Sequence, residues 1–167
     1  MRVAEVFWIL YIAASLRLTE THADGVRLFT NGEDDSLELW DDLVTEDAKV
    51  IMADTFAGDT RALEALAGNP AVGIWNRGAV IHALAILRRR GVVSLETLTE
   101  IYARQRDLLL SEARVAKGRG ESCENVAILA TALLMVAGLD LREPSLRALL
   151  WPLVEADLWD ETILNWT

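Results

Sequence analysis

The feature that most restricts the fold is a pair of stretches that would be apolar on every side of a helix. Residues 78–87 are apolar except at His82, and residues 126–139 are polar only at Thr131. A helix that is hydrophobic all round belongs in the middle of a core or in a membrane. Both stretches are shorter than the about 20 residues that a membrane span requires. We therefore expect two central helices within a soluble helical protein.

The other segments repeat apolar residues at helical spacing and are bounded by capping residues. Ser94 is placed to cap a long helix, and Gly58 and Gly91 are placed to end others. Pro144 suits a first turn, whereas Pro152 should kink or split the last helix. The sequence predicts about nine helices and no strand, with helices at residues 3–16, 24–29, 36–44, 45–58, 59–67, 72–90, 94–117, 126–139 and from 144 onward.

The size and composition of the chain fit one such helical domain. The 167 residues are 52% hydrophobic and include only three prolines, which supports a single domain over residues 1–167 with a real core. Short connections make neighbouring helices antiparallel, and the helix pairs recur about every 30–40 residues, a spacing typical of helical repeats. We expect an all-α stack of antiparallel helix pairs, as an α-solenoid or a compact bundle.

Three segments resemble known proteins. Residues 59–90 read D-T-R-A-L-E-A-L-A-G-N-P and then A-V-G-I-W-N-R-G-A-V-I-H-A-L-A-I-L, which resembles a HEAT-type repeat. The segments L-W-D-D-L-V-T-E-D (39–47) and V-E-A-D-L-W-D (154–160) are similar to the uncharacterised bacterial family called domain of unknown function 1186. The resemblance spans residues 37–160. It implies a HEAT-like binding scaffold and assigns no catalytic residue.

Charge suggests what the protein binds. The formal charge is -10, from 26 acidic and 16 basic residues, so phosphates would be repelled and direct nucleic acid binding is not expected. Eight acids and no base lie between positions 33 and 47, a predicted docking surface for a basic protein partner. The alternative is a solvated face with acids at helix N-termini. The acids are Glu33, Asp34, Asp35, Glu38, Asp41, Asp42, Glu46 and Asp47.

Tryptophans suggest a second contact surface. Three of the six, Trp151, Trp159 and Trp166, cluster in the last segment, and tryptophan is enriched at binding hot spots. They would equally suit the packed end of a helical stack. The other three, Trp8, Trp40 and Trp75, sit in apolar patterns, and we predict that they lie in the core.

Residues able to carry chemistry are few and scattered. The two histidines, His22 and His82, do not share a metal-binding spacing, and Cys123 is the single cysteine; we therefore expect no zinc and no other cofactor. There is no glycine-rich phosphate loop and no serine or cysteine elbow. Eight bases lie between positions 88 and 119 with Tyr102 as the single aromatic residue among them, too few for a nucleic acid platform, so we expect the bases to pair internally or to be solvated. A lone cysteine favours a reducing cytoplasm.

Three functional hypotheses follow. The first is a non-catalytic protein-binding module that uses the acidic surface. The second is a small inhibitor of the kind that phages direct against bacterial defence complexes, which would mimic nucleic acid with its acids. The third is an enzyme with a site at His82 or Cys123, for which the sequence offers no partner residues. The oligomeric state, including a homo-oligomer, stays open.

Overall fold

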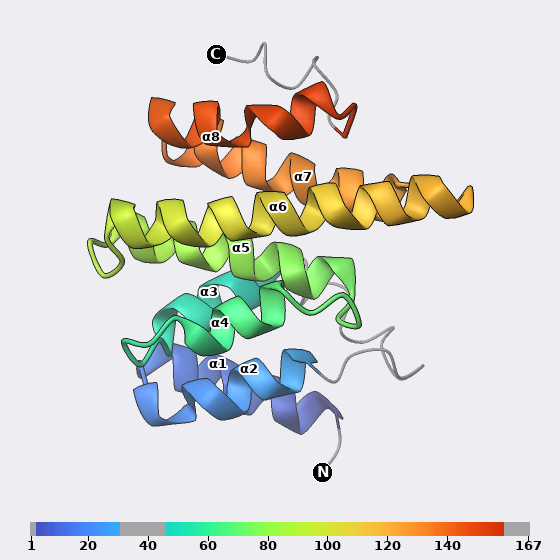
Figure 1. Cartoon of the computed structure of the whole chain (residues 1–167). Helices are drawn as coiled ribbons and strands as arrows, with labels where there is room; N and C mark the ends of the chain where they lie inside the picture. The colour runs from blue at the N-terminus through green and yellow to red at the C-terminus, as the bar shows by residue number, and fades with distance from the viewer. Residues whose placement is uncertain (1–2, 31–45, 159–167) are drawn as a thin grey trace. The chain divides into compact units, whose positions relative to one another are not determined.

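The computed structural model describes residues 3–30 and 46–158, and every regular element in these ranges is helical (Figure 1). This confirms the all-α fold class. The helices group into two compact units, Met1–Leu87 and Arg88–Thr167, and each is described by itself below. The single domain over residues 1–167 and the HEAT-like stacking stay predictions.

In the first unit, each of the helices α1 and α2 packs against the α-helix two places later in the chain. Helix α1 packs against α3, and α2 packs against α4, while α3 also touches α2. Its buried apolar side chains include Phe29, Ile51, Leu63 and Leu84. Its elements are α1 (Val3–Ser15), the 3-10 helix η1 (Thr19–Thr21), α2 (His22–Thr30), α3 (Ala48–Asp54), α4 (Arg61–Ala67) and α5 (Ile74–Arg89) as far as Leu87.

Helix α3 is shorter than the sequence predicted. We expected a helix that ends at Gly58, whereas α3 ends at Asp54. Both the backbone N–H and the hydroxyl of Thr55 donate to the carbonyl oxygen of Ile51, at 3.0 and 2.9 Å, and the helix goes no further. Phe56 is then buried outside the helix, so its apolar character does not mark a helical face. The helix predicted at residues 36–44 lies outside the described residues.

A buried arginine joins the end of α4 to the start of α5. Arg77 is 4% exposed, and its Nε donates to the carbonyl oxygen of Ala67 at 2.9 Å, one of the terminal carbonyls that a helix leaves unpaired. Asn76 is also buried, whereas Trp75 is exposed. The prediction that Trp75 lies in the core is wrong, because the first turn of α5 directs its polar pair inward and Trp75 outward.

The second unit is organised around the long helix α6. Helix α6 packs against both α7 and α8, and these two also touch each other. Ser94 caps α6 as predicted, since its Oγ accepts from the Thr97 N–H at 3.0 Å. The helix predicted at residues 126–139 is instead an α-helix followed by one π turn. The elements are α6 (Leu95–Arg119), α7 (Glu124–Met135), the π-helix η4 (Val136–Asp140) and α8 (Pro144–Glu155).

Pro152 does not split the last helix. Helix α8 starts at Pro144, as predicted, and continues through Pro152 to Glu155. A proline inside a helix removes one backbone donor and disturbs the preceding turn. The guanidinium of Arg106 on α6 donates to the carbonyl oxygen of Leu149 in that turn at 3.0 Å. A side chain from a neighbouring helix thus stabilises α8 where its own hydrogen bonding is weakest.

Three helix ends share one hydrogen-bond motif. After α6, the N–H groups of Gly120 and Glu121 donate back to Lys117 and Ala116, with Gly120 at a φ of 71°. This is the Schellman motif, which favours glycine at the left-handed position. The ends of α1 and α8 repeat it with Arg17 and Asp157 in that position. The sequence therefore marks the stop of α6 but hides the other two.

Across residues 3–30 and 46–158, no helix combines the length and the apolar character that crossing a membrane requires. Residues 78–87 are mostly buried on α5, whereas about half of residues 126–138 are buried. The buried side chains of α5 and α7 include Val80, Ile81, Leu84, Leu87, Leu129, Leu133 and Leu134.

Candidate functional site

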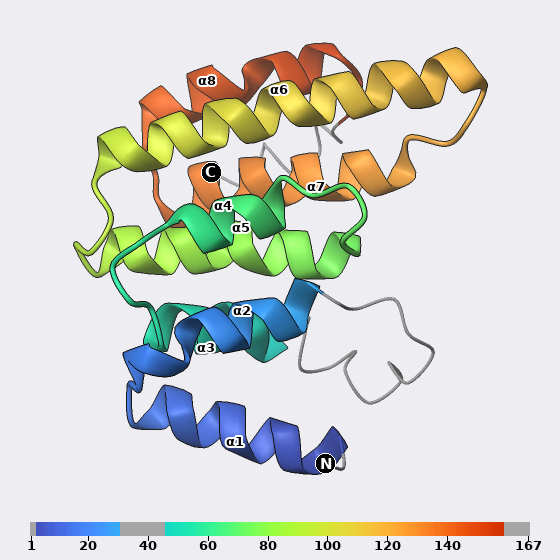
Figure 2. The same cartoon turned by 60° about the horizontal axis from the view of Figure 1, so that its bottom comes forward.

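The clearest surface feature of the first unit is an apolar face on α1. Four side chains are largely exposed, Trp8 at 69%, Ile9 at 54%, Ile12 at 55% and Leu16 at 65%. They occupy one side of the helix, at spacings of three and four residues. Figure 2 shows α1 at the edge of this unit, with α2 and α3 lying to one side of it. We call these four residues the α1 face.

The opposite side of α1 forms its contact with the core. Leu10, Ala13 and Ala14 are buried. The prediction that Trp8 is a core residue is wrong. From Val6 to Ala14, α1 is apolar on every side apart from Tyr11, so hydrophobicity alone cannot say which side packs. Among the α1 side chains with described burial, those that face the core are small or medium in size.

One edge of the α1 face carries acids. The Tyr11 hydroxyl donates to a carboxylate oxygen of Asp47, the residue before α3, and this hydrogen bond raises the pKa of Tyr11 to about 12. Glu46 is exposed beside Asp47. These are the two described members of the predicted acidic site. The other six, Glu33, Asp34, Asp35, Glu38, Asp41 and Asp42, lie outside the described residues, as does Trp40.

Of the three tryptophans predicted to form a contact surface near the C-terminus, Trp151 is the one within the described residues. Trp151 is exposed on α8 at 44%, as a contact residue would be. Trp159 and Trp166 lie outside the described residues. Leu158, directly after the end of α8, is fully buried. The C-terminal surface therefore stays a prediction that rests on Trp151.

A buried histidine is the polar feature of the first unit that sequence reasoning missed. His22, the first residue of α2, is 3% exposed and meets the ring of Phe56 edge-on, with 5.5 Å between centroids. Its Nδ1 lies 3.4 Å from the Thr55 hydroxyl oxygen. Because that hydroxyl donates to Ile51, its oxygen must accept from Nδ1–H. The proton of the neutral ring is thereby assigned to Nδ1.

The other ring nitrogen of His22 is an unpaired acceptor. Nε2 is buried and has no hydrogen-bond partner in the described part of the chain. Burial lowers the pKa of His22 below its ordinary value of 6.5, and the carboxylate of Asp59 opposes this shift. A proton added at Nε2 would place a positive charge in a dry site without an acceptor. Burial therefore favours the neutral form of His22.

We expect the stability of the first unit to fall as the pH drops from about 7.5 to about 5. His22 takes up a proton more readily in the unfolded chain than in the folded one, so acid favours unfolding. Urea titrations at several pH values would measure this dependence. In the His22→Gln variant the dependence should flatten over this range, above the titration of ordinary carboxylates. A pH dependence identical to that of the parent chain would contradict the role of His22.

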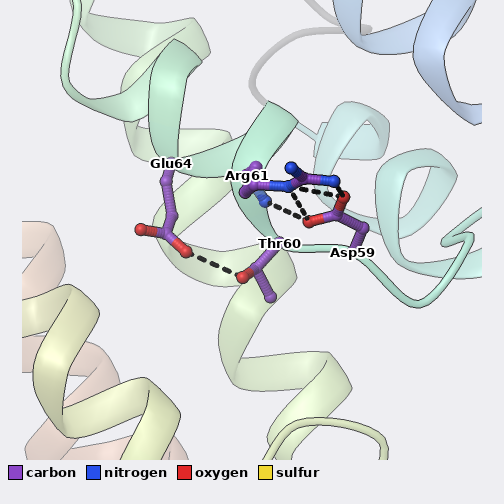
Figure 3. A network of polar contacts seen from close by, with 4 residues as sticks. All are labelled: Asp59, Thr60, Arg61 and Glu64. Carbon is purple, nitrogen blue, oxygen red and sulfur yellow. Dashed lines mark hydrogen bonds and ion pairs between the residues drawn. The ribbon is translucent and has the colours of Figure 1, made fainter.

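Asp59 belongs to a polar network that closes the turn before α4 (Figure 3). Its carboxylate accepts from the backbone N–H of Arg61 at 3.0 Å and from Nε of the same arginine at 2.7 Å. These bonds lower the pKa of Asp59 to about 2. The Thr60 hydroxyl donates to Glu64 at 2.7 Å. The network is exposed and local, so it fixes the start of α4 and offers no enclosed site.

Several of the eight basic residues between positions 88 and 119 bond to other groups within the second unit. Lys117 donates to the carbonyl oxygen of Ala156 at 3.1 Å, and Arg106 bonds Leu149. Arg88 pairs with Glu143 at 3.5 Å, and Arg119 lies 4.0 Å from Glu121. Internal pairing, as the sequence suggested, therefore accounts for these four.

Other candidate groups do not assemble. The Cys123 thiol, half-buried, donates to the carbonyl oxygen of Ala113 at 3.7 Å, and His82 is half-buried on α5. In residues 3–30 and 46–158, no three histidine, cysteine or acidic side chains gather closely enough to hold a metal ion.

Comparisons with known proteins identify the family. A family model described as a protein of unknown function, DUF1186, matches residues 4–124. No match was found among curated proteins or among solved structures. The matched range includes the quoted segments 39–47 and 59–90 but ends before residues 154–160, so it does not support the resemblance seen in that last segment. Because the match covers well over half of the chain, this protein belongs to the DUF1186 family.

Proposed function

We propose that this chain is a non-catalytic protein-binding module whose first unit attracts a partner with a basic surface. The observation that carries the proposal is the distribution of charge. Residues 1–87 hold 14 acidic and 6 basic side chains, a formal charge of -8, whereas residues 88–167 hold 12 acidic and 10 basic ones, a charge of -2. Charge concentrated in this way steers oppositely charged partners during association.

Two further observations support a binding role. The pairing of α1 with α3 and of α2 with α4 is what stacked helix pairs produce, and such stacks serve as scaffolds for binding. The buried His22 cannot reach a substrate, and the Cys123 thiol is engaged with a backbone carbonyl. We place the module in a reducing cytoplasm, consistent with its single cysteine.

The hypothesis of a nucleic acid-mimicking inhibitor explains the acidic residues but not the exposed apolar face. A nucleic acid mimic would need carboxylates spaced like the phosphates of a nucleic acid. A large exposed apolar face contributes nothing to such mimicry. The exposed Trp8, Ile9, Ile12 and Leu16 are instead typical of a protein contact. We therefore favour a binding module over a mimic.

Charge reversal tests the proposal. The Glu38→Lys, Asp41→Lys and Asp42→Lys triple variant changes the formal charge of residues 1–87 from -8 to -2. We expect it to bind a fluorescent octalysine peptide at least about tenfold more slowly at low salt, with a weaker dependence on salt. Stopped-flow association at two salt concentrations measures both.

The matched control reverses three acids in the other unit. Glu96, Glu100 and Glu155 are exposed on α6 and α8, and replacing them by lysine changes the total charge by the same amount. This control should slow association much less. If both triple variants slow association equally, the total charge of the chain is responsible, and the proposal of an acidic surface localised in the first unit is wrong.

A further inference from the structure

The α1 face has the size of the largest exposed apolar patch on a typical monomer. Its four residues are between 54% and 69% exposed, which corresponds to roughly 500 Å² at the size of large apolar side chains. The largest patch on a typical monomer covers about 300–600 Å² and is often functional. No charged residue interrupts the face between Trp8 and Leu16. It is therefore suited to an apolar contact.

Area and charge argue against a second copy of the chain as the occupant. A standard protein interface buries about 800 Å² on each partner, more than the α1 face supplies. Two copies would also bring together two units that each carry a formal charge of -8. The same charge opposes docking on an anionic lipid surface. The occupant should instead be narrow and basic.

The geometry of the face fits one helix. From Trp8 to Leu16 the face extends about 12 Å along α1, and an amphipathic helix presents anchors at positions i, i+3, i+4 and i+7 over a similar length. At the edge of the face, Asp47 bonds Tyr11 and Glu46 is exposed. Basic side chains that flank the apolar stripe of such a helix would meet these acids. Arg17, beyond the end of α1, is the exposed base near the face.

We propose that the α1 face binds an amphipathic helix of a partner protein, with an apolar stripe against Trp8, Ile9, Ile12 and Leu16 and lysine or arginine along its flanks. The inference rests on the proposed function and adds the kind of partner. The apolar stripe supplies most of the affinity, because burying several large apolar side chains stabilises a complex more than exposed ion pairs do. The flanking charges set the association rate and the orientation.

Three synthetic peptides of about 18 residues serve as probes. The first has leucine at helical spacing and lysine elsewhere. The second has the same composition in scrambled order, and the third keeps the leucine pattern but replaces lysine by glutamate. We expect the first peptide to bind the full chain at least about tenfold more tightly than either of the others. Fluorescence anisotropy of labelled peptides gives the dissociation constants.

Two tryptophan variants locate the site. Trp8→Ser should weaken binding of the first peptide at least about tenfold. Trp75→Ser is the matched control, because Trp75 is 53% exposed in the same unit and lies outside the α1 face. It should leave the dissociation constant within about twofold of the parent value. Circular dichroism checks that both variants remain folded.

Several outcomes would overturn the inference. Equal affinity for the ordered and scrambled lysine peptides would mean that charge alone is recognised, which leaves the proposed function standing. Equal loss in the two tryptophan variants would place binding elsewhere. A dimer in sedimentation that Trp8→Ser converts to monomer would assign the face to a second copy. Binding to phosphatidylcholine vesicles that Trp8→Ser abolishes, without peptide binding, would assign it to lipid.

Discussion

Replacing Leu63 by alanine is expected to lower the free energy of unfolding by about 2–5 kcal/mol, the range for truncating a fully buried leucine. Leu63 on α4 has no exposed surface, and it lies in the core of the first unit. The substitution removes apolar burial and leaves a cavity that the surrounding helices fill only in part. Urea denaturation followed by circular dichroism measures the loss.

Leu98→Ala truncates a buried leucine in the same way in the second unit. Leu98 on α6 is equally buried, so the expected loss is again about 2–5 kcal/mol. The pair tests whether residues 1–167 form one domain. In one cooperative domain, each variant shifts a single shared transition. If Leu63→Ala moves one transition and Leu98→Ala another, the two compact units fold independently and the single-domain prediction is wrong.

The exposed Val92 provides the control for this pair. Its side chain is 55% exposed near the start of the second unit. Val92→Ala should change the free energy of unfolding by no more than about 0.5 kcal/mol. A loss comparable with that of Leu98→Ala would show that the measured transition does not report on core packing.

Helix positions were readable from the sequence wherever a local signal sets them. Ser94 caps α6 and Pro144 begins α8, because each acts on its own turn of backbone. The end of α3 was not readable, because both Thr55 and Phe56 can continue a helix. Thr55 is instead buried beside His22, a contact between residues far apart in the chain.

The candidate site was predictable in its charge but not in its shape. The acids between positions 33 and 47 are visible in the sequence, whereas the α1 face is hidden because α1 is apolar on all sides. Trp8 and Trp75 were assigned to the core by pattern alone. Both are exposed because smaller or more polar neighbours on the same helix face inward. The burial of His22 likewise depends on contacts that the sequence does not specify.

Removing the guanidinium of Arg77 is expected to lower the free energy of unfolding by about 2–4 kcal/mol. Arg77→Ala deletes the donor to the Ala67 carbonyl and leaves a cavity at the junction of α4 and α5. Its matched control is Arg61→Ala, because the Arg61 side chain is 87% exposed and its ion pair with Asp59 is a surface pair. The control should leave the free energy of unfolding close to that of the parent chain.

Arg77→Met separates the hydrogen bond from the packing. Methionine keeps much of the apolar stem but cannot donate to Ala67, so the expected loss is about 1–3 kcal/mol, the penalty for leaving a buried acceptor unpaired. Lysine would not restore the bond, because it carries its charge at the tip of a flexible chain and has no donor at the Nε position. If Arg77→Met is as stable as the parent chain, the arginine serves only to fill space. If Arg77→Ala costs no more than Arg61→Ala, the junction between α4 and α5 does not depend on Arg77.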